Sequence, residues 1–124
     1  MIQDLDNLAA LRRAFHQAPE LGFRETQTKD RVAAVLGDIG LEVHRRTGVI
    51  GILRAGNVTR AISLRADMDA LPITKQSTHD DPSKTAGIMH ACGHDSHTTM
   101  LLGAAKHLAA TRDFDGTAVI VFQP

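Results

Sequence analysis

The segment MHACGHDSHT, residues 89–98, holds the side chains of this sequence that are best suited to bind a metal or to act as a nucleophile. It contains the only cysteine, Cys92, and three of the seven histidines. Cys92 and His94 are separated by one glycine, which lets the backbone turn tightly enough for both side chains to reach one ion. Thiolate and imidazole are both good ligands for zinc and its first-row neighbours. Taken alone, a C-x-H pair favours a buried thiol beside a surface histidine.

Two carboxylates follow a predicted strand in RADMDALP, residues 65–72. Asp67 and Asp69 are two residues apart, so they face the same side if the extended geometry continues past the strand. Taken singly, either would be explained by a turn that Pro72 enforces. Two carboxylates and a Cys/His cluster at one sheet edge are the donor types of a metal centre, which makes this hypothesis as well supported as the structural one.

A cysteine nucleophile is the competing chemistry for Cys92. It requires a base within hydrogen-bond reach, which His90 or His94 could supply. The sequence has no evident orienting partner for that base, whereas the carboxylates suit the surroundings of a metal. We therefore rank a thiol hydrolase below a metal site.

The remaining histidines indicate no further site. His16, which follows Phe15, is interpreted as a packing residue, and His97 as a cap neighbour or a donor to a metal ligand. No role is assigned to the other three, which are His44, His79 and His107.

Helical periodicity predicts two helices before residue 41. The first has an apolar stripe from Leu5 to Phe15 and ends before Pro19. The second has its stripe within residues 32–39, and Gly40 stands where a C-terminal glycine cap belongs.

A third helix shows its apolar periodicity from Thr98, which predicts Asp95 or Ser96 as its N-cap. The connection that leads to it from Asp69 is long, and long connections without regular structure in compact domains are usually functional.

β-Branched segments predict four strands, which are LEVHRR, VIGILR, AISLRA and TAVIVF. The first three are expected to have short antiparallel connections, with AISLRA central, and the continuous apolar run of TAVIVF predicts burial on both faces. A right-handed parallel crossover joins AISLRA to TAVIVF. Ligands bind beyond the carboxyl ends of such strands, where the chain carries Asp67, Asp69 and Gln123. The predicted class is therefore α/β, in the order α-α-β-β-β-α-β.

Composition restricts the classes of partner. The chain of 124 residues suits one domain, and 14 basic residues balance 14 acidic ones. This balance argues against a nucleic-acid surface or a polybasic membrane patch. No apolar run has the length of a signal peptide or a membrane span, which predicts a cytoplasmic protein.

Five segments in this order and spacing closely resemble the N-terminal part of a family of metallo-amidohydrolases: FHQAPELGFRE, GVIGILRAG, SLRADMDALPI, MHACGHDSHTTMLLGAAKHL and FDGTAVIVFQP. The family includes hippurate hydrolases, N-acyl-amino-acid aminoacylases, N-acetyl-diaminopimelate deacetylases and plant auxin-conjugate hydrolases. MHACGHD together with RADMDALP makes the resemblance specific.

The resemblance implies a three-layer sandwich, with a mixed sheet between helices, and two divalent metal ions (Zn, Mn, Co or Ni). These would activate a bridging water and polarise the scissile carbonyl of an N-acyl amino acid or a related small amide. Cys92 and His94 match metal ligands of the family. Asp69 matches an aspartate that orients a metal ligand or catalytic group, and is the catalytic residue we expect. Supporting positions around the ligands are Asp67, His90 and His97.

In that family the pattern continues beyond FQP with paired glutamates, one of them the general base, then further histidine ligands and a lid domain. We therefore expect residues 1–124 to be the N-terminal part of an incomplete catalytic domain, inactive alone, with one metal ion or none. Self-association is expected if an apolar strand edge is exposed. A truncated paralogue that binds a partner or a single ion, without catalysis, is the alternative from another class.

Overall fold

The structure is a computed structural model that describes residues 4–76 and 82–124. The element order is the predicted one, and the α/β class is confirmed. His79, which has no predicted role, lies outside the described residues. The helices are α1 (Leu5–Gln17), α2 (Thr26–Asp38) and α3 (His94–Thr111), and the strands are β1 (Glu42–Arg45), β2 (Val49–Ala55), β3 (Ala61–Asp67) and β4 (Gly116–Gln123).

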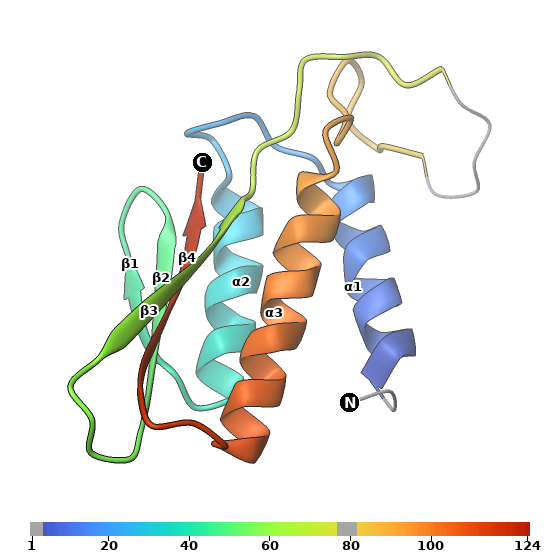
Figure 1. The fold of residues 1–124 in the computed structure, drawn as a ribbon. Helices are drawn as coiled ribbons and strands as arrows, with labels where there is room; N and C mark the ends of the chain where they lie inside the picture. The colour runs from blue at the N-terminus through green and yellow to red at the C-terminus, as the bar shows by residue number, and fades with distance from the viewer. Residues whose placement is uncertain (1–3, 77–81) are drawn as a thin grey trace.

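The strands form a mixed sheet in the order β1-β2-β4-β3 (Figure 1). Strands β1 and β2 pair antiparallel, as do β2 and β4. Strands β3 and β4, which precede and follow α3 in the sequence, pair in parallel. The predicted parallel pairing of AISLRA with TAVIVF is confirmed. Two other expectations are wrong: β3 is an edge strand of the described sheet, and β2 does not pair with β3. The apolar strand β4 occupies the place between them, where both of its edges are hydrogen-bonded.

The helices lie on one face of the sheet in Figure 1, with α2 and α3 against the strands and α1 packed on α3. Successive side chains of a strand point to opposite faces of the sheet, and paired residues of neighbouring strands point to the same face. Phe122 of β4 pairs with Val49 on one side and Ala66 on the other, and all three are buried on the face that the helices cover. The core between this face and the helices includes Val32, Leu36, Val49, Leu53, Leu102, Ala105, Ala118, Ile120 and Phe122.

Strand β4 corrects the expectation that TAVIVF is buried on both faces. Its residues alternate between buried and intermediate, so Ile120 is 1% exposed while the flanking Val119 and Val121 are only partly covered. The partly covered residues face away from the helices. The described residues therefore build the sheet and one of the two helix layers that the resemblance implies. None of the helices in these segments is long and apolar enough to cross a bilayer.

Helix α3 begins earlier than predicted, and neither Asp95 nor Ser96 is its N-cap. The N-cap is Gly93, which has a φ of +82°, in the left-handed region that glycine tolerates best. The first turn therefore contains His94 and Asp95, ahead of the apolar periodicity that starts at Thr98. The prediction was wrong because the first turn of α3 is polar, so hydrophobic spacing does not reveal it.

The start of α2 is stabilised by a residue outside the helix. Its N-cap residue, Glu25, makes no capping hydrogen bond with its side chain. Instead, the carboxylate of Glu20 accepts hydrogen bonds from the backbone N–H groups of Gln27 (3.1 Å) and Thr28 (2.7 Å), and from the Thr28 hydroxyl (2.7 Å). An anionic acceptor on the free N–H groups of a first turn satisfies them and complements the helix dipole.

Replacement of Glu20 by Gln is expected to lower the free energy of unfolding by about 1–2 kcal/mol. The carboxylate accepts all of these hydrogen bonds, whereas the glutamine amide has only one oxygen acceptor and turns an N–H donor towards the other donors. Urea denaturation followed by circular dichroism measures the change. Glu25→Gln is the matched control. The Glu25 side chain is fully buried with neither carboxylate oxygen hydrogen-bonded in the described structure, so its neutralisation is expected to be neutral or stabilising. Equal losses in both variants would contradict the capping role of Glu20.

Candidate metal centre

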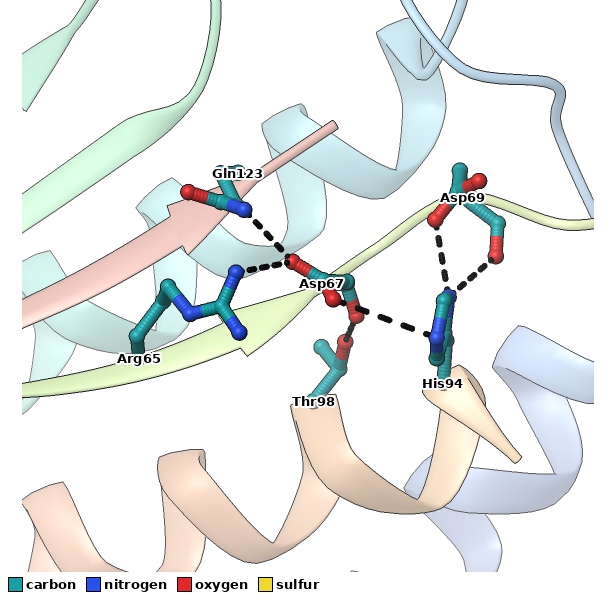
Figure 2. Close-up of polar contacts among 6 residues, drawn as sticks. All are labelled: Arg65, Asp67, Asp69, His94, Thr98 and Gln123. Atoms are coloured by element: carbon teal, nitrogen blue, oxygen red, sulfur yellow. Dashed lines mark hydrogen bonds and ion pairs between the residues drawn. The ribbon is translucent and has the colours of Figure 1, made fainter. Parts of the chain in front are cut away.

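The carboxyl ends of β3 and β4 meet the N-terminus of α3, and three of the predicted site residues, Asp67, Asp69 and His94, lie there (Figure 2). His94, the first residue of α3, approaches the segment that follows β3. Its Nδ1 lies 2.8 Å from Asp69 Oδ1 and 3.1 Å from the Asp69 carbonyl oxygen. The structure thus brings together one residue from each of the two predicted motifs.

These contacts decide the tautomer of His94. Both Asp69 atoms are acceptors, so Nδ1 carries the proton and donates it. The other ring nitrogen, Nε2, lies 4.0 Å from Asp67 Oδ2, beyond hydrogen-bond distance. The imidazole is 21% exposed. A histidine held by a carboxylate at one nitrogen presents the lone pair of the other to a metal or a proton.

Asp67 is held in place from three elements. Its Oδ1 accepts hydrogen bonds from the Gln123 side chain of β4 (2.8 Å) and from Arg65 (3.1 Å), and its carbonyl oxygen accepts one from the Thr98 hydroxyl of α3 (3.1 Å). The prediction that Asp67 and Asp69 face the same side is confirmed, since both approach His94 (Figure 2). The position of Gln123 at a strand end predicts its place at this edge, whereas no sequence pattern identifies Arg65 or Thr98.

The loop between α1 and α2 lies beside Asp69. A Cβ atom at Gly22 would lie 3.7 Å from Asp69 Cβ and 4.0 Å from Glu25 Oε1. The backbone N–H of Ala70 donates to the Glu20 carbonyl at 2.8 Å. The loop between α1 and α2 therefore supports the segment that carries Asp69.

The other residues of MHACGHDSHT have different surroundings. Cys92 is exposed, so the interpretation as a buried thiol is wrong. In the described structure no hydrogen bond joins Cys92 to His90 or His94, so the contact that a thiol nucleophile would require is not formed. His97 is also exposed, with its ring centroid 5.9 Å from that of His94.

His90 is 5% exposed, and neither of its ring nitrogens has a hydrogen-bond partner among the described residues. Burial lowers the pKa of His90 from its ordinary value of 6.5, and the nearby Asp95 carboxylate opposes this shift. A neutral imidazole is the result at pH 7. His16 is buried, as predicted, and it contacts Asp95.

The donors fit part of a metal site. His94 Nε2 is oriented by Asp69, and Cys92 supplies an accessible thiol two residues earlier, in the combination of nitrogen and sulfur that zinc and its neighbours accept. No group of three or more His, Cys, Asp and Glu side chains that could hold a metal ion is formed by residues 4–76 and 82–124. The described chain therefore offers fewer ligands than a closed site needs.

Curated relatives share nearly the whole chain. It is 48% identical over 117 residues to the hippurate hydrolase of Campylobacter jejuni, covering 92% of this chain and 30% of the relative. It is 46% identical over 110 residues to an N-acyl-L-amino acid amidohydrolase of Geobacillus stearothermophilus, covering 86% of this chain and 30% of the relative. The chain thus spans about a third of the length of these relatives.

A solved structure has the same fold. The YXEP protein of Bacillus subtilis, described as a dinuclear metal-binding peptidase of the M20 family, superposes with a TM-score of 0.92 at 38% identity, covering 96% of this chain and 34% of that one. The description of peptidase family M20/M25/M40 matches residues 63–124, from within β3 through α3 to the end of β4. This half of the chain contains Asp67, Asp69, Cys92 and His94. We conclude that the chain belongs to peptidase family M20/M25/M40.

Proposed function

We propose that the full-length protein hydrolyses the amide bond of N-acyl amino acids or similar small amides with two divalent metal ions, and that Cys92 and His94 are two of the ligands. The observation that carries the proposal is the hydrogen bond from His94 Nδ1 to Asp69 Oδ1, 2.8 Å long, which leaves Nε2 available at the carboxyl edge of the sheet. The names of the relatives support the substrate class.

Asp69 and Asp67 have distinct roles in this proposal. Asp69 fixes the ring orientation of His94 and increases the basicity of Nε2. Asp67, held by Gln123 and Arg65, places a second carboxylate oxygen 4.0 Å from Nε2 and adds negative charge that favours a cation there. When bound, the ions supply the polarisation of the substrate carbonyl and the activation of water.

The test is hydrolysis of hippurate and of N-acetyl amino acids by the full-length protein, freed of metal by a chelator and then reloaded with Zn, Mn, Co or Ni. We expect activity to disappear with the chelator and to return with one of these ions. Hydrolysis that persists in the chelator and is stopped by a single thiol modification would overturn the proposal in favour of a cysteine hydrolase.

The 124 residues alone are proposed to be inactive, because no group of three metal donors converges within the described residues. Assay of the purified chain with the same substrates and ions tests this. Metal-dependent turnover that Cys92→Ser abolishes would overturn it.

A further inference from the structure

A second set of buried polar side chains lies next to the centre, between α1 and the first turn of α3. Asp95 follows His94 directly and is 1% exposed. Its Oδ2 accepts a hydrogen bond from His16 Nδ1 at 2.8 Å and forms an ion pair with Arg12 Nε at 3.0 Å. Both partners belong to α1, so this helix is fastened to the residue that follows a proposed metal ligand.

The direction of these hydrogen bonds follows from a third segment. Lys75 Nζ lies 3.0 Å from His16 Nε2, and an ammonium group can only donate. His16 Nε2 is therefore the acceptor, and Nδ1 carries the proton that it donates to Asp95. Arg12 Nη2 lies 3.4 Å from the same Nδ1, at the outer limit of a hydrogen bond, so the shorter contact with Asp95 decides the direction. The chain of donors runs from Lys75 through His16 to Asp95, and it joins the connection after β3, helix α1 and helix α3.

Adjacent residues of a helix project about 100° apart, because there are 3.6 residues per turn. His94 is held by Asp69 from the β3 side, while Asp95 is held by Arg12 and His16 from the α1 side. Two contacts at this angle restrict both the rotation and the displacement of the first turn. The N-cap Gly93 adds no capping side chain, and the next tie to the strands is the hydrogen bond from the Thr98 hydroxyl to the Asp67 carbonyl, one turn further along α3.

We propose that Arg12, His16 and Asp95 form a positioning cluster that sets the placement of His94, and thereby the metal affinity of the centre. The inference rests on the proposed function, because it takes His94 as a ligand. The burial of Asp95 supports it. Its Oδ1 has no hydrogen-bond partner in the described part of the chain, and a half-satisfied buried carboxylate is a costly way to pack two helices that apolar residues could pack as well. A cost of this kind fits a requirement for one defined geometry.

The test is titration of the full-length protein with Co²⁺, followed by the thiolate-to-cobalt absorption of Cys92, together with the ring ¹⁵N shifts of His94 in the metal-free protein. Asp95→Asn and His16→Leu are expected to weaken Co²⁺ binding about 10–100-fold, as the loss of hydrogen-bonded partners of metal ligands does. Both variants should also shift the absorption band. His16→Asn retains an N–H donor close to the position of Nδ1, and it is expected to restore the wild-type affinity and spectrum.

Leu36→Ala is the control that distinguishes a positioning role from a general loss of stability. Leu36 is a core residue of α2 that is 0% exposed. We expect this variant to lose stability while its folded fraction binds Co²⁺ as the wild type does. Wild-type affinity in His16→Leu, or an equal loss of affinity in Leu36→Ala, would overturn the inference and leave the metal site standing. Full-length protein that binds no Co²⁺ would overturn the proposed ligands, and the inference with them. If Asp95→Asn does not fold, the comparison of His16→Leu with His16→Asn decides.

Discussion

The His94→Ala variant of the full-length protein is expected to bind Zn²⁺ more than ~100-fold more weakly than the unchanged protein, because loss of the proposed ligand exceeds the 10–100-fold cost of losing a ligand's hydrogen-bonded partner. His94 Nε2 is available at this edge because the other ring nitrogen, Nδ1, is hydrogen-bonded to Asp69. Cys92→Ser is expected to have a similar effect, because a hydroxyl is a poorer ligand than a thiolate for this ion. Isothermal titration calorimetry with Zn²⁺ measures both changes.

Two further variants separate the proposed ligand His94 from its surroundings. Asp69→Asn is expected to weaken binding by about 10–100-fold, because the amide accepts the Nδ1 proton less strongly than the carboxylate does. His107→Ala, an exposed residue towards the far end of α3, is the matched control and should leave the affinity unchanged. Unchanged Zn²⁺ affinity in His94→Ala would place the ligands elsewhere in the chain.

The order of helices and strands could be predicted because it depends on local periodicity. Apolar spacing identified α1, and Gly40, with its φ of +88°, ended α2 as predicted. Sheet order was less accessible, because the partner of a strand is decided by contacts far along the chain. β4 pairs with both β2 and β3, which lie far from it in the sequence, so the order of strands along the chain does not reveal their order in the sheet.

The centre likewise has a part that could be predicted from the sequence and a part that could not. The types and spacing of Asp67, Asp69 and His94 were sufficient to predict that they would come together, since strand ends and helix starts meet at one sheet edge. The hydrogen bonds that fix them could not be found in this way, although the end of the last strand placed Gln123 at this edge. Gln123 reaches Asp67 across 56 residues of sequence, and His16 reaches Asp95 across 79. Hydrogen bonds of this range arise from the packing of elements, and they leave no periodic signal.

The Gly48→Ala variant is expected to lose about 3 kcal/mol of the free energy of unfolding, at the upper end of the range for overpacking. Gly48 lies in the turn between β1 and β2. A Cβ atom there would be 2.1 Å from the carbonyl oxygen of Phe122 and 3.2 Å from Gln123 Cα. These are backbone atoms of a strand that is paired on both sides, so they cannot rotate away as a side chain could. Thermal denaturation should show a fall in Tm of roughly 10 °C or more.

Gly37→Ala is the matched control for the same chemical change. Gly37 lies within α2, and a Cβ atom there would meet nothing within 4 Å. Alanine is the better helix former, so this variant is expected to gain about 0.5–1 kcal/mol. A Gly48→Ala variant as stable as Gly37→Ala would mean that the turn relaxes without displacing β4.

The effect of Gly48→Ala should extend to the centre because the strained atoms adjoin Gln123. This residue donates from its side chain to Asp67 Oδ1 at 2.8 Å, and its carbonyl oxygen accepts the backbone N–H of Met68 at 2.8 Å. Displacement of the end of β4 would lengthen both bonds and release the carboxylate that faces His94. The side-chain amide signals of Gln123 and the ring shifts of His94 should therefore move in the folded variant, whereas neither should move in Gly37→Ala. The turn between β1 and β2 would then contribute to the geometry of the centre through the end of β4.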